Sequence, residues 1–565
     1  MVLWTLSRNP GPPRSPYTIL AIFLLSLWGL TNALATQPQR PLGESLSETQ
    51  ELLDFATDLG ESDARGVDSW SLEAPAQTLQ NLLDALNVMQ DGYFCMWLGT
   101  WPTSIDWTAA VLSTHVSASL SSFTSYGLGA DAEQPHNQSS LALENTVNRF
   151  FSQLNTFYFG ENAFELRNQA YDDMLWVVLN WLENIKFQDL HTELHYTPNI
   201  SSGSAWYGTQ FRDSAAHRAR IFYELASAGW DKTLCDGGMI WNPSLTPYKN
   251  AITNELFISA SIAMYLYFPG DPIDAPFLTT QDTASGIHNP IHLKAAVDGY
   301  TWLRDSNMTG IYGLYADGFH ISGWRSASNP GTRKCDVLNT MVFTYNQGVI
   351  LSGLRGLWLA TGSQDYLRDG HELIHKVLRA TGWPRTSSTN WAGLGRGGVL
   401  EDTCDSHASC SQDGQTFKGI FFHHLTEFCR PLRPQEKQFL AETRRPVADE
   451  NWEQVFRRHL NRCRAYGPWI EHNARAVLMT RDDDGKFGMW WGIPFSSILA
   501  DEVVDSSTLP EGAVDYRNGN MDDGTSAVGV PRDFNDRGRG RTVETQSGGV
   551  AVLRALFQWQ TSVLS

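Results

Sequence analysis

The amino-acid sequence predicts an all-α fold built as one large domain. From about Pro75 onward, apolar residues recur with the period of a helix, and the alternation of apolar and polar residues that marks strands is nearly absent. Loops with Gly, Pro, Asn and Trp separate the helical segments, and no convincing linker divides them. A chain of 565 residues with 42% apolar content can also bury a large core. One all-helical domain over residues 75–565 is therefore the economical prediction.

The predicted helices follow one another at short intervals, each with apolar residues three or four positions apart, as a helix with one buried face requires. They span residues 78–90, 107–122, 141–157, 171–185, 214–228, 250–267, 293–304, 345–360, 366–380, 417–428, 452–466, 470–479 and 549–561. Residues 501–549 are rich in Asp, Gly, Ser and Arg and poor in apolar residues. We expect this stretch to form a long polar excursion at the surface before the final helix.

The N-terminal residues have the features of a secretory leader. Two arginines precede an apolar run at 19–30, and an A-x-A cleavage pattern follows at 33–35. The run breaks off before the about 18 residues that a membrane-spanning helix needs, so an uncleaved anchor is the less favoured alternative. We expect residues 1–35 to be a signal peptide and residues 36–74 to be a polar, flexible arm.

The end of the chain and its charge fit a secreted protein. Residues 555–565 are too short and too polar for a GPI-anchor signal, so no stable membrane anchor is expected after signal cleavage. The formal net charge of −19 argues against a nucleic-acid partner, which would require a basic face. Sequons for N-glycosylation begin at Asn137, Asn199 and Asn307. We expect an extracellular protein, either freely secreted or associated with a cell wall.

The cysteines predict disulfides rather than a metal site. All seven lie outside any zinc-binding spacing, and an oxidising compartment would pair most of them. Cys404 and Cys410 are the favoured pair because a short polar loop separates them. An odd total leaves at least one thiol unpaired within the chain.

Two adjacent aspartates, Asp172 and Asp173, open the predicted helix at 171–185. Cleavage of a sugar acetal by its commonest route needs two carboxyl groups, one at the anomeric carbon and one that protonates the leaving oxygen. Neighbouring carboxylates disfavour ionising together, so one of them can stay protonated and act as the acid. Acidic residues are also common in the first turn of any helix, where they interact with its positive end. The pair alone therefore indicates helix-end electrostatics more often than catalysis.

Tryptophan is abundant, with 21 residues, and many of these lie in loops or near helix ends. Examples are Trp97, Trp101, Trp107, Trp206, Trp241, Trp391, Trp490 and Trp491. A single tryptophan more often fills a core, because large aromatic side chains dominate burial. Indole faces also suit the C–H faces of sugar rings, so together these residues favour a carbohydrate cleft over a site for a small charged ligand.

Several motifs occur in the order in which they appear in glycoside hydrolase family 76, which the sequence resembles over about residues 75–560. The motifs are Tyr171-Asp-Asp-Met-Leu-Trp176, Tyr248-Lys-Asn-Ala-Ile-Thr-Asn-Glu-Leu-Phe257, Ala316-Asp-Gly318, Thr344-Tyr-Asn-Gln-Gly-Val349 and Phe417-Lys-Gly-Ile-Phe421. That family contains bacterial endo-α-1,6-mannanases and fungal cell-wall proteins that process or transfer GPI-anchor glycans. Five such motifs in order are hard to explain by chance.

The resemblance implies an (α/α)6 barrel, two concentric rings of six helices with a sugar-binding groove at one end. It also implies a retaining mechanism, in which Asp172 is the nucleophile and Asp173 the acid/base. Neighbouring side chains on a regular helix diverge by about 100°, whereas a retaining pair needs carboxyl groups about 5 to 5.5 Å apart. We therefore expect the pair to lie at a helix end, at the mouth of the barrel.

The remaining motifs supply candidate substrate-binding residues. Asn250 and Asn254 share a helical face and can bond sugar hydroxyls, with helix capping or bonding between helices as the alternative. Asp317 could hold hydroxyls of the sugar that is cleaved, or form a turn.

The later motifs add residues whose roles are less specific. Tyr345 and Asn346 are expected at or beside the substrate, and Gln347 is expected more often to have a structural role. Lys418 could orient a carboxylate, contact substrate or simply be a solvated surface residue. Trp241 is a further candidate, although Trp241-Asn242 stands where family members have paired tryptophans. His423 and His424 likewise replace a basic residue and an aromatic residue, so fine specificity stays open.

The sequence favours a secreted retaining glycoside hydrolase that cleaves α-1,6-mannosidic linkages in mannan. A transglycosylase that acts on wall mannan or GPI-type mannose glycans is the alternative, and differs only in the acceptor. A second alternative, from another class of protein, is a wall protein that binds carbohydrate without catalysis. The intact aspartate pair argues against this alternative. The proposed chemistry requires no cofactor and no metal.

Overall fold

The structure, a computed structural model, describes residues 73–126, 138–161, 163–196, 206–273, 286–442, 451–495, 509–518 and 533–564. The predicted signal peptide and nearly all of the predicted arm lie outside these residues, as do the sequons at Asn137 and Asn199. The third sequon residue, Asn307, is exposed just after a helix end. None of the helices in the described part of the chain is both long and apolar enough to cross a membrane.

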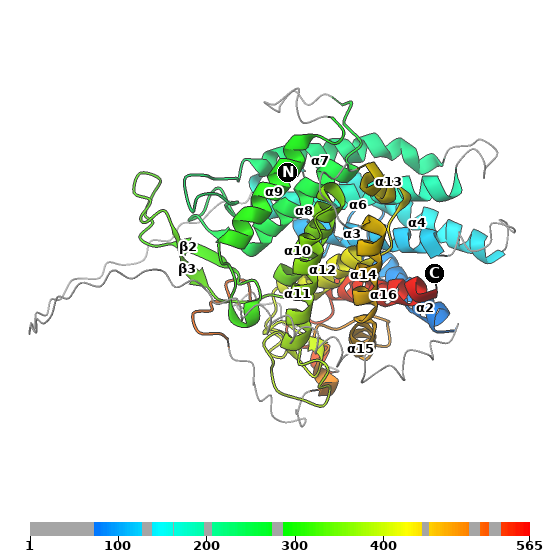
Figure 1. The fold of residues 1–565 in the computed structure, drawn as a ribbon. Helices are drawn as coiled ribbons and strands as arrows, with labels where there is room; N and C mark the ends of the chain where they lie inside the picture. The colour runs from blue at the N-terminus through cyan, green and yellow to red at the C-terminus, as the bar shows by residue number, and fades with distance from the viewer. Residues whose placement is uncertain are drawn as a thin grey trace, which may run out of the picture. The chain divides into compact units, whose positions relative to one another are not determined.

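Six of the helices within the described residues form a closed inner ring (Figure 1). They are α3 (Asp106–Tyr126), α6 (Tyr171–His195), α8 (Ala251–Tyr267), α10 (Val349–Thr361), α12 (Gln412–Cys429) and α16 (Val543–Leu564). Each one packs against the next in this order, and α16 packs against α3 to close the ring. The last helix of the chain therefore completes the barrel.

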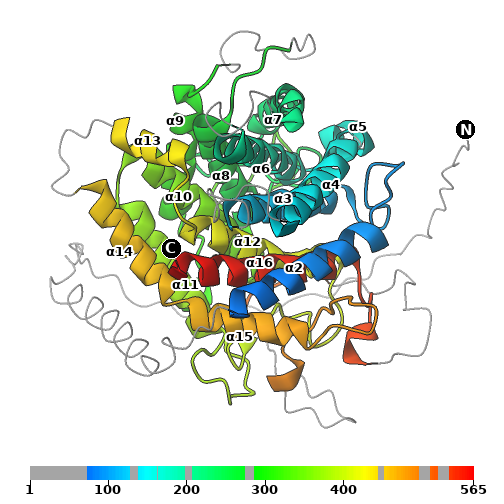
Figure 2. The ribbon, with the colours of Figure 1, turned by 90° about the vertical axis from the view of Figure 1, so that its right-hand side faces the viewer.

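Outer helices alternate with these along the chain and cover them from outside (Figure 2). They are α2 (Glu73–Gly92) on α16, α4 (Gln138–Gly160) on α3, α7 (Arg212–Ser227) on α6, α9 (Pro290–Asp305) on α8, α11 (Asp365–Ala380) on α10 and α15 (Gly467–Leu478) on α16. The helix α14 (Trp452–Arg464) contacts α12, and α13 (Pro434–Glu442) contacts α10. This arrangement is an (α/α)6 barrel, so the predicted fold is confirmed.

The two layers differ in how their helices are buried. In α12 every residue from Gly414 to Cys429 is buried, because neighbours surround an inner helix on all sides. In α11 the buried residues include Leu367, His371, Ile374 and Leu378, three or four positions apart, as one covered face requires. The periodicity that predicted helices is therefore clearest in the outer layer.

The predicted helices all occur, with shifted ends. The final helix begins at Val543 rather than near residue 549, so the polar excursion is shorter than expected. The helix predicted from Tyr345 begins as a 3-10 turn, η4 (Tyr345–Gln347), before α10. Two further helices, α5 (Ala163–Asn168) and α13, were missed because they are too short to show a clear period.

Short strands join the loops at one end of the barrel. The strands β1 (Lys249–Asn250), β2 (Gly318–Ile321) and β3 (Cys335–Asn339) form an antiparallel sheet in that order. A second pair, β4 (Gly395–Arg396) and β5 (Val399–Leu400), forms a hairpin. Strands of this length carry too few residues to show alternation, so the sequence did not reveal them.

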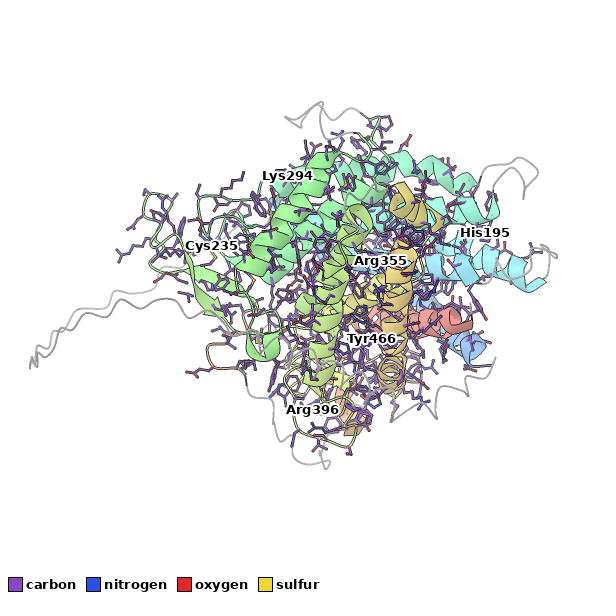
Figure 3. All side chains as sticks on the ribbon, viewed as in Figure 1. His195, Cys235, Lys294, Arg355, Arg396 and Tyr466 are labelled. Carbon is purple, nitrogen blue, oxygen red and sulfur yellow. A yellow bond between two sulfur atoms is a disulfide. The ribbon has the colours of Figure 1, made fainter. Side chains whose placement is uncertain are left out.

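Three disulfides occur among the described cysteines, and Cys95 is free. The predicted pair Cys404–Cys410 is confirmed. Cys235–Cys335 ties the loop after α7 to β3, and Figure 3 shows Cys235 on the side of the molecule where these strands lie. Cys429–Cys463 joins the end of α12 to α14. Cys429–Cys463 thus fastens an outer helix to the inner ring, while the other two bridges constrain loops.

Gly348 offers a test of how closely the inner helices approach. It lies between η4 and α10, and a Cβ atom there would stand 2.6 Å from the Phe421 Cα on α12. We expect Gly348→Ala to lower the free energy of unfolding by about 1–3 kcal/mol, because neither backbone can yield without disturbing the ring. Chemical denaturation measures this change. Gly92→Ala is the matched control, since no atom lies within 4 Å of its added Cβ. Equal stability of the two variants would contradict the close packing of α10 on α12.

Candidate active site

The aspartate pair lies in the first turn of α6, where the inner helices begin. The indole N–H of Trp107 on α3 donates to Asp413 Oδ1 on α12 at 2.9 Å. The hydroxyl of Thr108 on α3 donates to Glu544 Oε1 on α16, also at 2.9 Å. The starts of these helices therefore meet at one end of the ring. The expectation that the pair occupies a helix end at the barrel mouth agrees with this position.

Asp172 is 4% exposed and is held by several donors. Its Oδ1 accepts the backbone N–H of Asp173 at 3.1 Å, and the indole N–H of Trp241 bonds the same carboxyl group. Burial raises the pKa of Asp172 to about 6, while the positive charge of Arg517 and these hydrogen bonds oppose the rise. The carboxyl group is therefore largely ionised at neutral pH.

Asp173 is partly exposed and has a different electrostatic environment. Burial raises the pKa of Asp173 well above its usual range, and the negative charges of Asp172 and Asp413 raise it further. Arg517 opposes this effect only in part. The two neighbouring carboxyl groups thus differ in protonation, with Asp172 the one that ionises first.

Arg517 supplies positive charge to this end of the barrel, and the sequence did not point to it. Its guanidinium group lies 5.3 Å from the ring centroid of Trp241. It interacts with the charges of Asp172, Asp317 and Asp413, which raise the pKa of the arginine against the effect of burial. One partly buried cation therefore interacts with several carboxyl groups from different parts of the chain.

The segment that carries Arg517 is anchored at both ends. The backbone N–H of Val514 donates to Asn339 Oδ1, and Asn339 Nδ2 donates to the carbonyl of Val514, each at 2.9 Å. Asn518 Oδ1 accepts the backbone N–H of Ser411, the cap of α12, at 2.8 Å. This part of the predicted excursion is therefore fixed against β3 and α12. Composition alone cannot show such anchoring, because both partners are remote in sequence.

Asp317 lies just before β2 and is 3% exposed. Its Oδ2 accepts the hydroxyl of Tyr248 at 2.6 Å and the amide of Asn339 at 3.3 Å, whereas Oδ1 has no hydrogen-bond partner. The ring of His320 lies over Tyr248 at 4.3 Å. Burial raises the pKa of Asp317, and the charge of Arg517 opposes this rise. One free acceptor at this position fits the predicted contact with a sugar hydroxyl.

Tyr345 and Asn346 are buried, with polar groups that lack partners. The Tyr345 ring stacks on Phe417 at 3.8 Å, and its hydroxyl has no hydrogen-bond partner. Burial is the main reason that the pKa of Tyr345 lies well above its usual range, and the negative charges of Asp317, Asp172 and Asp413 raise it further. The amide of Asn346 also lacks partners for both of its polar atoms. Both residues are therefore available for further hydrogen bonds.

The two asparagines at α8 and Gln347 have structural roles. Asn250 caps α8 by accepting the N–H of Thr253, which leaves only its Nδ2 unpartnered. Asn254 accepts the N–H of Met239 and donates to two backbone carbonyls, and the residue is 1% exposed. Because its amide already bonds the backbone on both sides, the predicted contact with a sugar is wrong. Gln347 bonds the backbone of Tyr315 in both directions, in agreement with the structural role expected for it.

Lys418 is not a solvated surface residue, because it is buried and paired with a carboxylate. It is 2% exposed, and its Nζ pairs with Asp405 Oδ2 at 2.6 Å. Burial and the charge of Asp405 raise the pKa of Asp402 to about 7, and Lys418 opposes this rise. Asp402 in turn accepts the backbone N–H of Thr344, directly before Tyr345. Lys418 therefore orients the carboxylate of Asp405, one of the roles expected for it, and that carboxylate accepts the backbone N–H of Asp402 at 3.2 Å.

The tryptophans divide between the core and the mouth. Trp101, Trp206, Trp490 and Trp491 are almost completely buried, which agrees with the packing role expected of single tryptophans. Trp241 is half-buried beside Asp172, where its backbone carbonyl also accepts the N–H of Tyr171 at 2.9 Å. Among these tryptophans, Trp241 is therefore the one whose indole contacts the aspartate pair.

Comparison with known proteins links the chain to one family. The model of glycosyl hydrolase family 76 matches residues 212–466, a range that begins after the aspartate pair and ends before Arg517. Mannan endo-1,6-alpha-mannosidase DCW1 of Candida glabrata is 27% identical over 218 residues, and its namesake from Saccharomyces cerevisiae is 25% identical over 216. Each alignment covers 37% of this chain. The chain spans 39% and 38% of the lengths of these relatives.

Solved structures with a similar chain path were also found. An inactive variant of alpha-1,6-mannanase GH76A of Salegentibacter sp. HEL1_6, in complex with alpha-1,6-mannotetrose, is 16% identical with a TM-score of 0.48. The match covers 86% of this chain and 99% of that one. Dfg5 from Chaetomium thermophilum, in complex with glucosamine, is 13% identical with a TM-score of 0.46, and 80% of each chain is covered.

The family match includes the loops and helices that bring Asp317, Tyr345 and Asp413 to the barrel mouth, and the remaining motifs lie on the same closed ring of helices. Over residues 212–466, this chain is therefore similar to glycoside hydrolase family 76.

Proposed function

We propose that this protein is a secreted, retaining glycoside hydrolase that cleaves α-1,6-mannosidic linkages within mannan. The observation that carries the proposal is the unequal protonation of two adjacent carboxyl groups at the barrel mouth. Asp172 has a pKa of about 6, whereas the pKa of Asp173 lies well above its usual range. One ionised and one protonated carboxyl group are the pair that retaining hydrolysis needs at neutral pH.

In the first step, an ionised oxygen of Asp172 attacks the anomeric carbon as the glycosidic bond breaks. Asp173 gives its proton to the departing oxygen, so the leaving sugar departs as a neutral alcohol. In the second step, Asp173, now ionised, takes a proton from water, and the resulting hydroxyl oxygen displaces Asp172 from the sugar. The product keeps the starting configuration because the anomeric carbon is inverted twice.

Neighbouring residues suit the charge changes in this cycle. Arg517 and the indole N–H of Trp241 favour the ionised form of Asp172 before attack. Asp413 keeps the proton on Asp173 until the leaving oxygen can accept it. The free Oδ1 of Asp317 and the unpartnered hydroxyl of Tyr345 are candidate partners for sugar hydroxyls. The mannan substrate is proposed from the names of the curated relatives.

The roles of the pair predict the activities of two conservative variants. We expect Asp172→Asn to lose activity on linear α-1,6-mannan by about 10³-fold or more, because the amide is a poor nucleophile. Asp173→Asn should lose roughly 10²- to 10⁴-fold through loss of general acid catalysis. Chromatography of the released oligosaccharides measures both effects, and Asp305→Asn, at an exposed position, is the control.

An added acceptor oligosaccharide separates hydrolysis from transfer in the same assay. Shorter products that are independent of the acceptor support the hydrolase, and extended acceptors indicate a transglycosylase. Full activity in both aspartate variants would rule out the assignment of the pair. Binding of mannan without either product would indicate a carbohydrate-binding protein.

Arg517 predicts a shift in the pH dependence of activity. Activity should fall below about pH 6 as Asp172 gains a proton, and should fall at alkaline pH as Asp173 loses its own. Because Arg517 lowers the pKa of Asp172, we expect Arg517→Gln to move the acidic limb upward by about one pH unit or more. The profile of kcat/KM measures this shift. Arg464→Gln, on the exposed face of α14, is the control, and an acidic limb that stays in place in Arg517→Gln would contradict the proposed role.

A further inference from the structure

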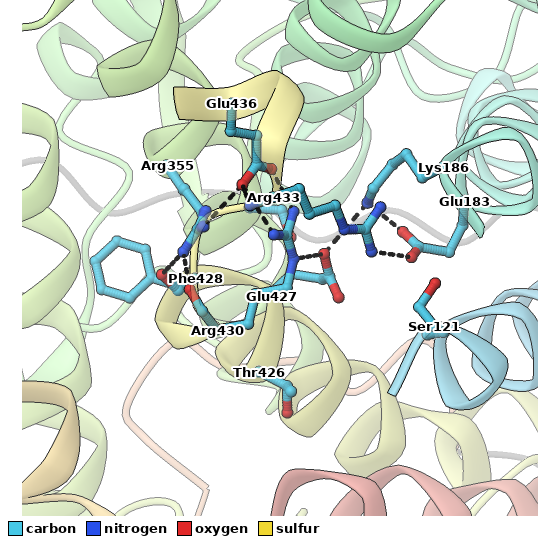
Figure 4. Close-up of polar contacts among 12 residues, drawn as sticks. Ser121, Glu183, Lys186, Arg355, Thr426, Glu427, Phe428, Arg430, Arg433 and Glu436 are labelled. Atoms are coloured by element: carbon cyan, nitrogen blue, oxygen red, sulfur yellow. Dashed lines mark hydrogen bonds and ion pairs between the residues drawn. The ribbon is translucent and has the colours of Figure 1, made fainter. Parts of the chain in front are cut away.

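Buried arginines around the end of α12 show the usual way in which a protein holds a cation away from water (Figure 4). Arg430 pairs with both Glu427 and Glu436, and Arg355 also pairs with Glu436. Burial of a charge is costly unless an opposite charge or several hydrogen bonds compensate for the lost water. Lys249, on β1, is buried as deeply but is held in a different way.

Lys249 is 0% exposed, and four backbone carbonyls of the loop that follows α7 surround its ammonium group. Its Nζ lies 2.8 Å from the carbonyl oxygen of Asp231, 2.7 Å from that of Leu234 and 3.0 Å from that of Gly238, and it also bonds the carbonyl of Gly237. The carboxylate of Asp231 lies farther away, at 3.7 Å. One loop therefore encloses one cation mainly through its backbone.

The ammonium group remains mostly charged at neutral pH. Burial lowers the pKa of Lys249 to about 8, and the negative charges of Asp231 and Asp236 oppose this change. Carbonyl oxygens that converge on one point repel one another, because each carries partial negative charge. A cation between them replaces this repulsion with attraction. Removal of the charge should therefore loosen the loop.

The backbone path of this loop needs such support. Cys235 and Asp236 have φ angles of 58° and 56°, in the left-handed region that is unfavourable for residues other than glycine. From outside, Trp302 on α9 packs so closely that a Cβ atom added to Gly238 would lie 2.5 Å from its ring. The indole N–H of Trp302 also donates to the carbonyl of Cys235 at 2.9 Å. Lys249 holds the same loop from the opposite, buried side.

The enclosed loop leads directly to a contact of the aspartate pair. Trp241 follows Gly238 by three residues, and its indole N–H bonds the carboxyl group of Asp172. The backbone N–H of Trp241 donates at 2.8 Å to the carbonyl of Tyr248, the residue before Lys249. Lys249 is therefore connected to Trp241 from two directions, through the loop and through Tyr248.

We propose that Lys249 is a positioning residue, whose ammonium group holds this loop so that the indole N–H of Trp241 meets the carboxyl group of Asp172. The side chain of Lys249 is fully buried, so it acts through the loop rather than on the substrate. This role rests on the proposed function, in which Asp172 attacks the sugar.

The pH profile of kcat/KM on linear α-1,6-mannan tests this role in Lys249→Met, which removes the charge and keeps most of the side-chain length. The N–H of Trp241 lowers the pKa of Asp172, so we expect the acidic limb to move upward when this contact is lost. We also expect kcat/KM at neutral pH to fall roughly tenfold or more, because the nucleophile is misplaced. Lys294→Met, whose native side chain is 74% exposed on α9, is the matched control and should keep the original profile.

The same substitution in a Trp241→Phe background separates positioning from a general structural defect. Phenylalanine has no indole N–H, so the acidic limb of Trp241→Phe is already displaced and Lys249→Met should move it no further. An equal upward move in both backgrounds, or an unchanged limb in Lys249→Met alone, would overturn the proposal.

Hydrogen exchange followed by mass spectrometry tests the positioning without reference to activity. We expect peptides that cover residues 229–241 to exchange faster in Lys249→Met than in the original protein, and Lys294→Met to exchange as the original does. Unchanged exchange in Lys249→Met would overturn the proposal. An original protein that leaves mannan uncut would contradict the proposed function alone, because hydrogen exchange still decides the role of Lys249.

A second variant keeps the test decisive if Lys249→Met does not fold. Asp231→Asn removes the carboxylate that lies 3.7 Å from the Lys249 ammonium group and leaves the four carbonyls in place. We expect faster exchange over residues 229–241 in this variant as well, to a smaller extent. Exchange that matches the original protein would overturn the proposal.

Discussion

The electrostatic interaction of several carboxyl groups with the guanidinium group of Arg517 is the interaction on which the barrel mouth depends. Asp172, Asp317 and Asp413 come from three distant parts of the chain, and all of them interact with this one arginine. Burial raises the pKa of Asp172 and of Asp317, and the positive charge of Arg517 opposes this rise at both. The arginine keeps the pKa of Asp172 low enough for ionisation near neutral pH, whereas Asp173 retains its proton. Arg517 lowers the pKa of both acids, and the negative charges of Asp172 and Asp413 are what raise the pKa of Asp173 further.

The helical barrel makes this crowding possible. Helices α3, α6, α12 and α16 begin at the same end, where their free N–H groups and positive dipole ends favour negative charge. The short β1–β2–β3 sheet brings Asp317 to the same region, and hydrogen bonds between Asn339 and Val514 fix the segment that ends in Arg517. At the other end of the ring the helix carbonyls favour cations, and Arg430, Arg433 and Arg554 lie there.

Local patterns in the sequence revealed most of the fold but only part of the site. Helical periodicity located the helices, and the aspartate pair could be recognised because both acids are adjacent in one motif. Asn254 was misjudged because the same amide chemistry serves a sugar or a backbone, and only the contact with Met239 decides between them. Arg517 could not be predicted, since its segment looks like surface loop until its contacts with β3 and α12 are known. Asp413 meets its partner Trp107 across 306 residues.

The central claim is that Asp172 forms a covalent bond with the sugar. Incubation with a 2-deoxy-2-fluoro-mannosyl fluoride, which slows breakdown of the glycosyl-enzyme, followed by peptide mass spectrometry, tests it most directly. We expect one fluoromannosyl group on the peptide that contains Asp172, attached to that residue, and no adduct in Asp172→Asn. An adduct on Asp173 or Asp413, or continued turnover of the reagent without any adduct, would contradict the claim.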